Sequence, residues 1–243
     1  MNVNRVALFY PYVVNPVSTT REEFNACARR FADTYRRFPG DWPHRLYVVC
    51  CNGPLDQEAR DTFAGLNVTF DTYDGQGWDI GCEQYMARKC VADFVIGMTA
   101  RSYFHRRGWL KRFIEARNTF GMGLYGTTGS YEVAPHIRTA FYGVDTLLYV
   151  LYPHIIDSRQ KGFYFESEDW SFTRFVSSLG YPCLMVTWDG CYAQGDWRKP
   201  ANIFRSGDQS ALLVFDRHSL IYERADPNVR VMLKSAADGT LAR

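Results

Sequence analysis

The sequence predicts an α/β fold in which a mostly parallel central sheet is flanked by helices within a single domain. Short apolar runs of strand length alternate with longer amphipathic runs through residues 5–98, and consecutive parallel strands need such helical crossovers. No repeat, linker or low-complexity tract divides the 243 residues. The chain is therefore expected to form one sheet with helices on both of its faces.

The first half of the chain shows the most regular alternation. Segment 21–38 has the clearest helical pattern, because Phe24, Phe31 and Tyr35 share one face and charged residues occupy the other. Pro39 and Gly40 end it. Strands are expected at 5–14, 44–51, 67–73 and 93–98, and helices at 21–38, 55–64 and 81–91.

The loops at one edge of this predicted sheet are where a site is expected. Ligands of open parallel sheets bind in the crevice at the carboxyl ends of the strands. These ends are followed by the loops after Tyr10, Cys51, Tyr73 and Met98.

The second half is less regular. The expected elements are a helix at 109–120, a Gly- and Thr-rich loop or short strand at 121–130, a mixed segment at 140–152, a helix that ends at Leu179, and a strand at 183–187.

Composition excludes several classes of protein. Lys and Arg number 28 against 26 Asp and Glu, and no long basic run occurs, which argues against nucleic acid or a membrane surface as the main partner. The seven cysteines have no metal-site spacing, and their odd number favours free thiols in a reducing compartment. No apolar stretch approaches the ~18 residues of a membrane span, and no signal-like segment opens the chain. A cytoplasmic protein without a transmembrane segment is expected.

A cluster of acids occupies residues 166–170 (ESEDW), just before the predicted helix that ends at Leu179. Like charges this close raise one another's pKa, which suits a general base. The alternative is structural, since carboxylates also stabilise a helix N-terminus by about 0.3–1 kcal/mol.

A second group of polar residues surrounds the turn 74–81 (DGQGWDIG). Asp74 and Asp79 flank glycines that allow the backbone to approach a phosphate closely. An ordinary turn with a helix cap at Asp79 explains the same residues. Asn52, in Asn52-Gly53-Pro54, is either a ligand contact or part of a plain turn.

Four blocks in this order resemble the GT-A glycosyltransferases, and specifically the inverting family 2. The resemblance covers about residues 5 to 190. The blocks are the strand that leads into Tyr10-Pro11, the segment 51–54 (CNGP), the turn 74–81, and Glu168-Asp169 placed twelve residues before Gly180-Tyr181.

The resemblance implies a GT-A-like domain that transfers a hexosyl or deoxyhexosyl group, with inversion, from a nucleoside-diphosphate sugar to a glycan or glycoconjugate acceptor. Surface polysaccharide synthesis is the expected setting. The nucleotide-binding half is then about 1–101 and the acceptor half about 102–243. Asp169 is the expected base, with Glu168 in reserve. The expected donor-binding residues are Tyr10, Pro11, Asn52, Asp74, Gly77, Asp79, Thr99 and Arg101.

One departure from the family pattern concerns the metal site. The family's fourth strand ends in Asp-x-Asp, which holds a divalent metal on the diphosphate, whereas this chain has Thr99-Ala100-Arg101. No metal ligand or cofactor is therefore assigned, although a divalent metal bound elsewhere stays an alternative. Either Arg101 replaces the metal by pairing with phosphate oxygens, or the protein is a catalytically silent module that binds glycan or nucleotide as a partner subunit.

The acceptor site is expected in the second half. His136 and Arg138 follow the Gly- and Thr-rich segment, and Trp188-Asp189 follows the last predicted strand. A structural histidine and a surface arginine are the alternative for the first pair. A hydrolase that uses the same acids is a further possibility, but glycosidases need a second carboxyl group across the bond, and the sequence does not identify one.

Overall fold

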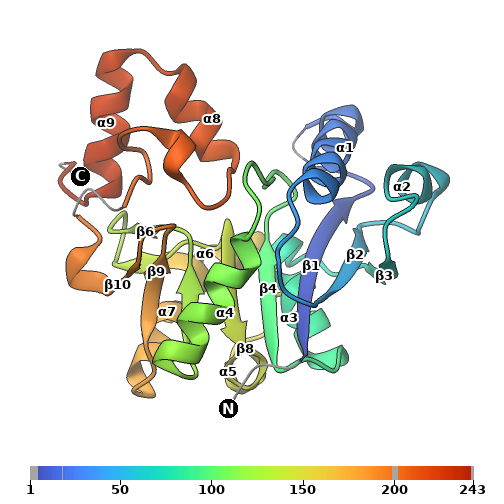
Figure 1. Ribbon diagram of the computed structural model, residues 1–243, viewed down its shortest axis with the longest axis horizontal. Coiled ribbons are helices and arrows are strands. Elements are labelled where there is room, and N and C mark those ends of the chain that lie inside the picture. Colours follow the sequence, from blue (N-terminus) through green and yellow to red (C-terminus); the bar gives the residue numbers. More distant parts are fainter. Residues whose placement is uncertain (1–4, 18, 199–201, 242–243) are drawn as a thin grey trace.

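A computed structural model of the chain describes residues 5–17, 19–198 and 202–241 (Figure 1). Its centre is an eight-stranded sheet with the order β10-β9-β5-β8-β4-β1-β2-β3, and β6 and β7 form a separate pair. β8 runs antiparallel to both β4 and β5, and β10 is antiparallel to β9. The other neighbours within the eight-stranded sheet are parallel, and β6 and β7 are antiparallel to each other. The strands are β1 (Val6–Val13), β2 (Arg45–Cys51), β3 (Val68–Tyr73), β4 (Phe94–Met98), β5 (Leu124–Gly126), β6 (Gly129–Ser130), β7 (His136–Ile137), β8 (Phe141–Asp145), β9 (Cys183–Val186) and β10 (Cys191–Tyr192).

Helices cover both faces of this sheet, because each central strand is apolar on both sides. In β1, Leu8 and Tyr10 point into one core and Ala7 and Phe9 into the other. The first core is closed by α1 (Arg21–Arg37), α2 (Gln57–Thr62) and α4 (Trp109–Phe120), and the second by α3 (Trp78–Lys89), α5 (Thr146–Leu151), α6 (Arg159–Ser167) and α7 (Phe172–Ser178).

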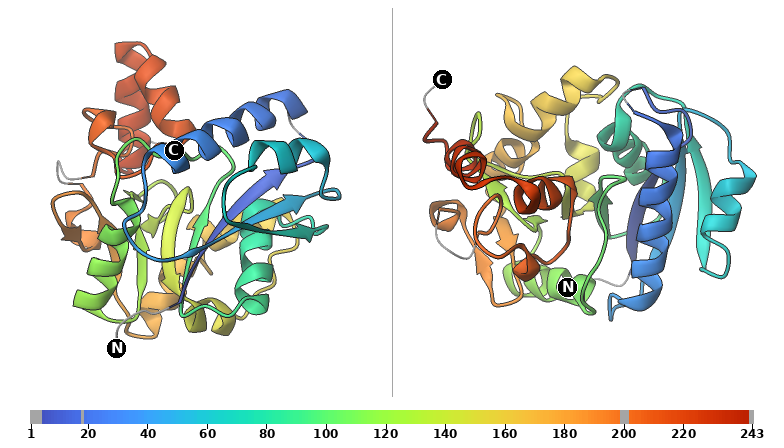
Figure 2. Two further views of the ribbon diagram at one scale, coloured as in Figure 1. Left: turned by 45° about the vertical axis from the view of Figure 1, so that its right-hand side comes forward. Right: turned by 90° about the horizontal axis from the view of Figure 1, so that it is seen from above.

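Two more helices, α8 (Arg217–Arg224) and α9 (Pro227–Ala237), stand beyond one end of the sheet, at the upper left of Figure 1. The view from above in Figure 2 places α8 across from α1, with the strand ends between them. Asp216 fixes the start of α8 through a capping box with Ser219. The two short 3-10 turns are Gln194–Asp196 and Gln209–Ala211.

The fold class predicted from the sequence is confirmed, and so are the strands and helices expected before residue 120. α3 begins three residues earlier than expected, at Trp78, whose backbone φ of 56° is unusual for a bulky residue. Gly77, just before it, allows the tight packing there, since a Cβ at that position would lie 2.0 Å from the carbonyl oxygen of Ile156.

The helix expected after the acidic cluster is present as α7, but the cluster also extends into the end of α6. Glu166 belongs to the last turn of α6, Glu168 is the C-cap residue of that helix, and α7 begins only at Phe172 behind the N-cap residue Ser171. Helix α6 was not predicted, because its apolar residues are only weakly concentrated on one face of the helix. Helices α8 and α9 were also not predicted.

Two expectations about chemistry can be compared directly with the structure. All seven cysteines are free thiols, as their sequence pattern predicted. Within the described ranges, no helix combines the length and the apolar character that a membrane crossing requires.

The topology creates a crevice at one edge of the sheet. β1 pairs with β2 on one side and with β4 on the other, so the connections from this pair of strands leave in opposite directions. Such a switch point opens a space at the carboxyl ends of the strands, where ligands of open α/β sheets bind.

Candidate functional site

Two adjoining cavities lie at this switch point. The larger, called the main cavity here, has a volume of about 230 Å³ and reaches from the start of α3 and the end of β4 to α6 and the start of α8. The smaller, called the side cavity, has a volume of about 70 Å³ and lies against the ends of β1 and β2. Trp78, Asp79 and Arg101 line both of them, so the two form one elongated site.

The side cavity has mainly apolar walls. Pro11, Val13 and Phe24 contribute to it, and Asn52 adds a polar group at the end of β2. Asn52 adopts a left-handed backbone conformation (φ 60°), and its carbonyl oxygen accepts a hydrogen bond of 2.6 Å from the Asn15 side chain. An apolar slot that also contains one amide suits an aromatic ring such as a nucleobase.

Asp79 and Glu166, two of the three carboxylates that line the main cavity, have pKa values shifted in opposite directions. Burial raises the pKa of Asp79 to about 6, and the charge of Glu166 adds to this shift. For Glu166, burial acts in the same direction, but interactions with His136, Arg138 and Thr139 outweigh it and hold the pKa below its usual value. Such divergent environments assign different roles to paired acids.

The position of Glu166 is fixed by the backbone. Its Oε1 accepts a hydrogen bond of 3.1 Å from the backbone N–H of Thr139, which holds the end of α6 against the segment before β8. Because Glu166 is ionised at neutral pH, it can accept a proton from a bound hydroxyl group.

Arg138 anchors the wall of the main cavity formed by the C-terminal helices. Its side chain is only 7% exposed, forms an ion pair of 2.9 Å with Asp216, and stacks on the Phe204 ring at 3.9 Å. Burial opposes ionisation of Asp216, but Arg138 holds its pKa below the ordinary value. Burial and the neighbouring arginines lower the pKa of His218 to about 4, so this ring is neutral at physiological pH.

Three more guanidinium groups face the cavity. Arg101 pairs with Glu23 of α1 at 2.9 Å and stacks on Phe24. Arg159 stacks on Trp78, and Arg217 is exposed at the start of α8. Neither Arg159 nor Arg217 has a carboxylate partner within the described ranges. The cleft is therefore poised to bind an anion.

The residues at the end of β4 do not fit a hard divalent cation. Thr99 and Arg101 line the cavity where the family pattern has two aspartates, and the guanidinium repels a cation. No cluster of three potential metal-ligating acids, histidines or cysteines occurs in the described part of the chain.

Most of the predicted donor-site residues meet in this cleft. Tyr10 does not line it: its side chain is 1% exposed, stacks on Phe31 at 4.0 Å, and donates a hydrogen bond to the Ala100 carbonyl oxygen. Asp74 is exposed and lines neither cavity. The predicted donor-site residues that do line the cleft are Pro11, Asn52, Gly77, Asp79, Thr99 and Arg101, and Arg138, which was predicted for the acceptor site, lines it as well.

The two acids expected to be catalytic lie outside the cavities. The Asp169 carboxylate is 94% exposed and pairs with Arg174 at 3.0 Å. Glu168 also lines neither cavity. The acid of the same cluster that reaches the cleft is Glu166.

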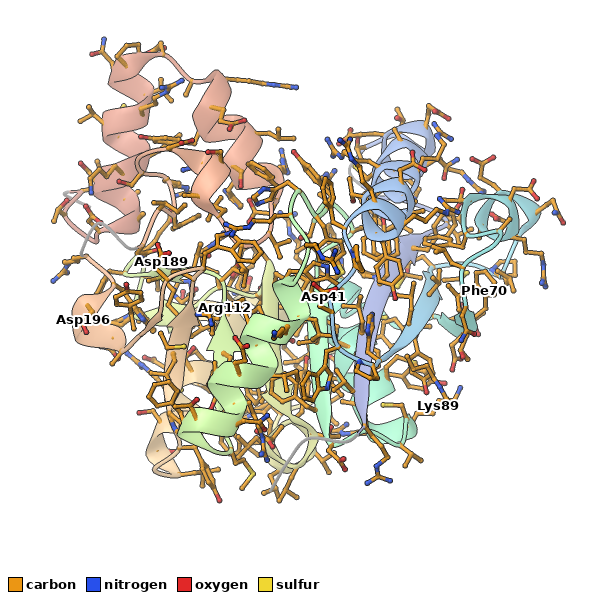
Figure 3. All side chains as sticks on the ribbon, in the orientation of Figure 1. Asp41, Phe70, Lys89, Arg112, Asp189 and Asp196 are labelled. Atoms are coloured by element: carbon orange, nitrogen blue, oxygen red, sulfur yellow. The ribbon has the colours of Figure 1, made fainter. Side chains whose placement is uncertain are left out.

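The predicted acceptor residues are separated from one another. His136 is 4% exposed, its Nδ1–H donates to the Ala134 carbonyl oxygen at 2.7 Å, and it lines neither cavity. Trp188 donates to the Leu212 carbonyl oxygen and stacks under Arg106. Figure 3 shows Asp189 near β9 and β10, away from β1 and β2.

The sequence interpretation missed the contribution of α6 and α8. Arg159, Asp216, Arg217 and His218 line the main cavity, and none was singled out. The signal that was present is the Asp216–Ser219 spacing of a helix start, which gives no indication of a ligand site by itself.

Comparisons with known proteins find likeness in fold. No family model and no curated protein matches the chain. A mannosyltransferase from Pyrobaculum calidifontis, solved with GDP-Man and Mn2+, is 13% identical with a TM-score of 0.46, covering 61% of this chain and 46% of that one. S. aureus TarS is 10% identical with a TM-score of 0.45, covering 66% and 32%. Mouse xyloside xylosyltransferase 1 is 8% identical with a TM-score of 0.46, covering 73% and 82%.

The chain thus spans less than half the length of the first two of these proteins. At such identities the likeness concerns the arrangement of strands and helices.

Proposed function

We propose that the protein is an inverting glycosyltransferase that uses a nucleoside-diphosphate sugar. The observation that carries this proposal is the elongated cleft, in which an apolar slot, a group of arginines and an ionised carboxylate follow one another. These three parts match a nucleobase, a diphosphate and a reacting hydroxyl group in turn. The role of the glycan as acceptor belongs to the same proposal.

The donor occupies both cavities. The nucleobase lies in the side cavity beside Asn52, and the diphosphate lies at the junction of the cavities, where Arg101 can leave Glu23 and pair with phosphate oxygens. Arg217 adds positive charge from the opposite side. Because these guanidinium groups neutralise the leaving diphosphate, the proposed transfer needs no metal at the end of β4.

Glu166 is the proposed base. As the acceptor oxygen attacks the anomeric carbon, the bond from that carbon to the diphosphate oxygen breaks, and the hydroxyl proton passes to the Glu166 carboxylate. The leaving nucleoside diphosphate takes the electron pair of the broken bond. A single carboxylate on the acceptor side is sufficient for inversion.

A thermal-shift screen of nucleotide sugars with and without EDTA tests the donor site. Stabilisation by a UDP-, GDP- or dTDP-sugar that persists in EDTA is the expected result, since a ligand that binds only the folded state raises its stability. A complete lack of response to nucleotides would remove the proposal.

Arg101→Ala examines the junction of the cavities. We expect nucleotide affinity to fall about tenfold or more, because a charge-assisted contact contributes about 1.5–3 kcal/mol. Arg107→Ala is the matched control, because Arg107 pairs with Asp41 and lines neither cavity. If the affinity of the Arg101 variant equals that of the control, the diphosphate does not lie at this junction.

A silent binding module is the competing function. It predicts that a nucleotide sugar binds but that neither transfer nor hydrolysis of the donor is detected. The ionised Glu166 inside the cleft favours the enzyme, since a carboxylate repels an anionic donor and a neutral glutamine could accept the same hydrogen bond from Thr139.

A further inference from the structure

A third cavity opens between α1 and α8, and its wall contains arginines beyond those assigned to the proposed donor site. This α1–α8 groove has a volume of about 470 Å³. Its polar wall consists of Glu23, Arg30, Arg101, Arg217 and Arg224. Four guanidinium groups therefore face one carboxylate.

Arg30 is the clearest sign that the groove is prepared for an anion. Its guanidinium lies 4.2 Å from the centre of the Tyr103 ring, and its Nη2 donates only to the thiol sulfur of Cys27, at 3.7 Å. Its buried Nε has no hydrogen-bond partner. A ligand in the groove cannot reach this buried atom, so the terminal nitrogens of Arg30, which have no carboxylate partner in the described residues, are the groups that can donate to an anion.

The other arginines also lack carboxylate partners. Glu23 forms its ion pair with Arg101 and with none of the other three arginines of the groove in the described residues. Arg217 and Arg224 project from α8 and have no ion pair within the described residues. Three of the four positive charges in the α1–α8 groove are therefore uncompensated.

The floor of the groove is apolar. Ala26 and Cys27 of α1 face Leu220 and Ile221 of α8. A small inorganic anion would leave this surface in contact with water, whereas a phosphate attached to an apolar or sugar body would cover it.

The groove is connected to the proposed reaction site. Arg101 and Arg217 line both the α1–α8 groove and the main cavity that contains Glu166. A ligand held in the groove can thus extend toward Glu166 in the main cavity, while the nucleobase of the donor lies in the side cavity and its diphosphate at the junction.

We propose that the α1–α8 groove binds a phosphate group carried by the acceptor, with Arg30, Arg217 and Arg224 as its ligands. The assignment of the bound molecule as the acceptor rests on the proposed function. The binding of phosphate in the groove does not depend on that function. The acceptor is then a phosphate-bearing molecule whose hydroxyl group reaches Glu166, and neutral sugars are poor acceptors.

Calorimetric titration with inorganic phosphate tests the groove. The double variant Arg30→Gln, Arg224→Gln is expected to bind phosphate about tenfold or more weakly than the unmodified protein. The matched control is Arg37→Gln, Arg60→Gln, which removes the same charge from exposed positions of α1 and α2 outside the groove. Equal phosphate affinity in the double variant and the control would overturn the proposal.

The single variant Arg224→Gln guards against misfolding, because Arg224 is exposed and supports no core contact. It is expected to weaken phosphate binding alone, with unchanged thermal stability. An unchanged phosphate affinity in a folded double variant counts against the groove in the same way.

Nucleotide-induced thermal stabilisation, measured on the same variants, separates the two proposals. If the double variant keeps the stabilisation by nucleotide but loses phosphate binding, the result supports both proposals. If the double variant loses phosphate binding and nucleotides do not stabilise even the unmodified protein, the result supports the phosphate site in the groove and contradicts the proposed glycosyltransferase function. If nucleotides stabilise the protein but the double variant binds phosphate with unaltered affinity, only the proposed phosphate site in the groove is contradicted.

Two further arms identify the source of the phosphate. Competition by glucose 1-phosphate that is lost in the double variant indicates a water-soluble phosphosugar. Sedimentation with phosphatidylcholine vesicles that contain phosphatidic acid, but not with vesicles that lack it, indicates a lipid-borne phosphate. If the double variant behaves as the control does in both arms, the groove does not bind phosphate esters.

Discussion

The two halves of the molecule contribute different things to the cleft. Residues 5–101 supply its shape: the ends of β1 and β2 form the apolar slot, and the tight start of α3 closes it. Residues 102–241 supply most of its charge, through Arg138, Arg159, Glu166, Asp216 and Arg217. Binding surface and reactive groups therefore come from different parts of the chain.

The difference follows from how each half is built. In the first half, repeated strand–helix units place every strand end at one edge, so the cleft is a consequence of topology. In the second half, charged groups reach the same edge from a loop, from the end of α6 and from the start of α8. Changes in the second half should consequently alter chemistry, and changes in the first half should alter fit.

The largest expected effect is on turnover, through Glu166→Gln. Removal of a general base typically costs about 10²–10⁴ in rate, whereas the isosteric amide keeps the shape of the cavity. We expect nucleotide-sugar turnover to fall by about this factor with donor affinity unchanged. Steady-state kinetics combined with nucleotide titration would measure both quantities.

Glu168→Gln is the matched control, because it makes the same change two residues away, outside the cavities. Should both variants retain full turnover, the second half does not carry the chemistry and the contrast between the halves fails.

The next largest effect is on stability, through Arg138→Met. This change leaves Asp216 buried without its partner, and breaking a buried pair costs about 3–5 kcal/mol. Arg174→Met breaks the exposed pair with Asp169 and is expected to cost at most about 1 kcal/mol. Urea unfolding of both variants measures the contrast. Equal losses would mean that α8 is not tied to the cleft through Arg138.

Local patterns in the sequence were sufficient for the fold of the first half and for part of the cleft. The helix 109–120 matches α4 because Gly108 and Gly121 bound an amphipathic run. Asn52 and Arg101 were predicted because each follows a strand whose end the topology brings to one edge, and Pro11 because it lies near the end of β1 at the same edge. These predictions depended only on order along the chain.

The rest of the site depends on contacts between distant residues. Arg138 and Asp216 are 78 positions apart, and nothing near Asp216 distinguishes it from an ordinary helix cap. Glu166 was noticed only as a member of the acidic cluster. Its selection over Asp169 requires knowledge of where α6 ends, because one turn of helix decides which carboxylate faces the cavity.

A smaller effect is expected from Asp79→Asn, and it depends on pH. The pKa of Asp79 in the folded protein is about 6 against a reference of 3.8, so the folded state holds this proton more tightly than the unfolded state. The stability of the unmodified protein should therefore decrease as the pH rises from about 4 to about 6. Asparagine removes this dependence and should stabilise the protein at pH 7 by up to about 3 kcal/mol.

Unfolding free energies measured at about pH 5 and about pH 7 check the sign. The gap between the variant and the unmodified protein should widen with pH. A gap that narrows would show that Asp79 is stabilised as an anion, so that the positive charge of Arg101 outweighs the burial of this carboxylate.

The smallest effect is expected from Asp169→Asn. A pair as exposed as Asp169 with Arg174 contributes about 0–1 kcal/mol, and its carboxylate lies outside the cavities. Turnover should therefore stay within a few-fold of the unmodified protein, measured beside Glu166→Gln in the same assay. The comparison is decisive because the two acids belong to one short segment and differ in which of them lines the cleft. A loss in the Asp169 variant that matches the loss in the Glu166 variant would restore Asp169 as the base. The end of α6 would then have to rearrange when ligands bind, and the charges of the second half would be assembled by the ligand.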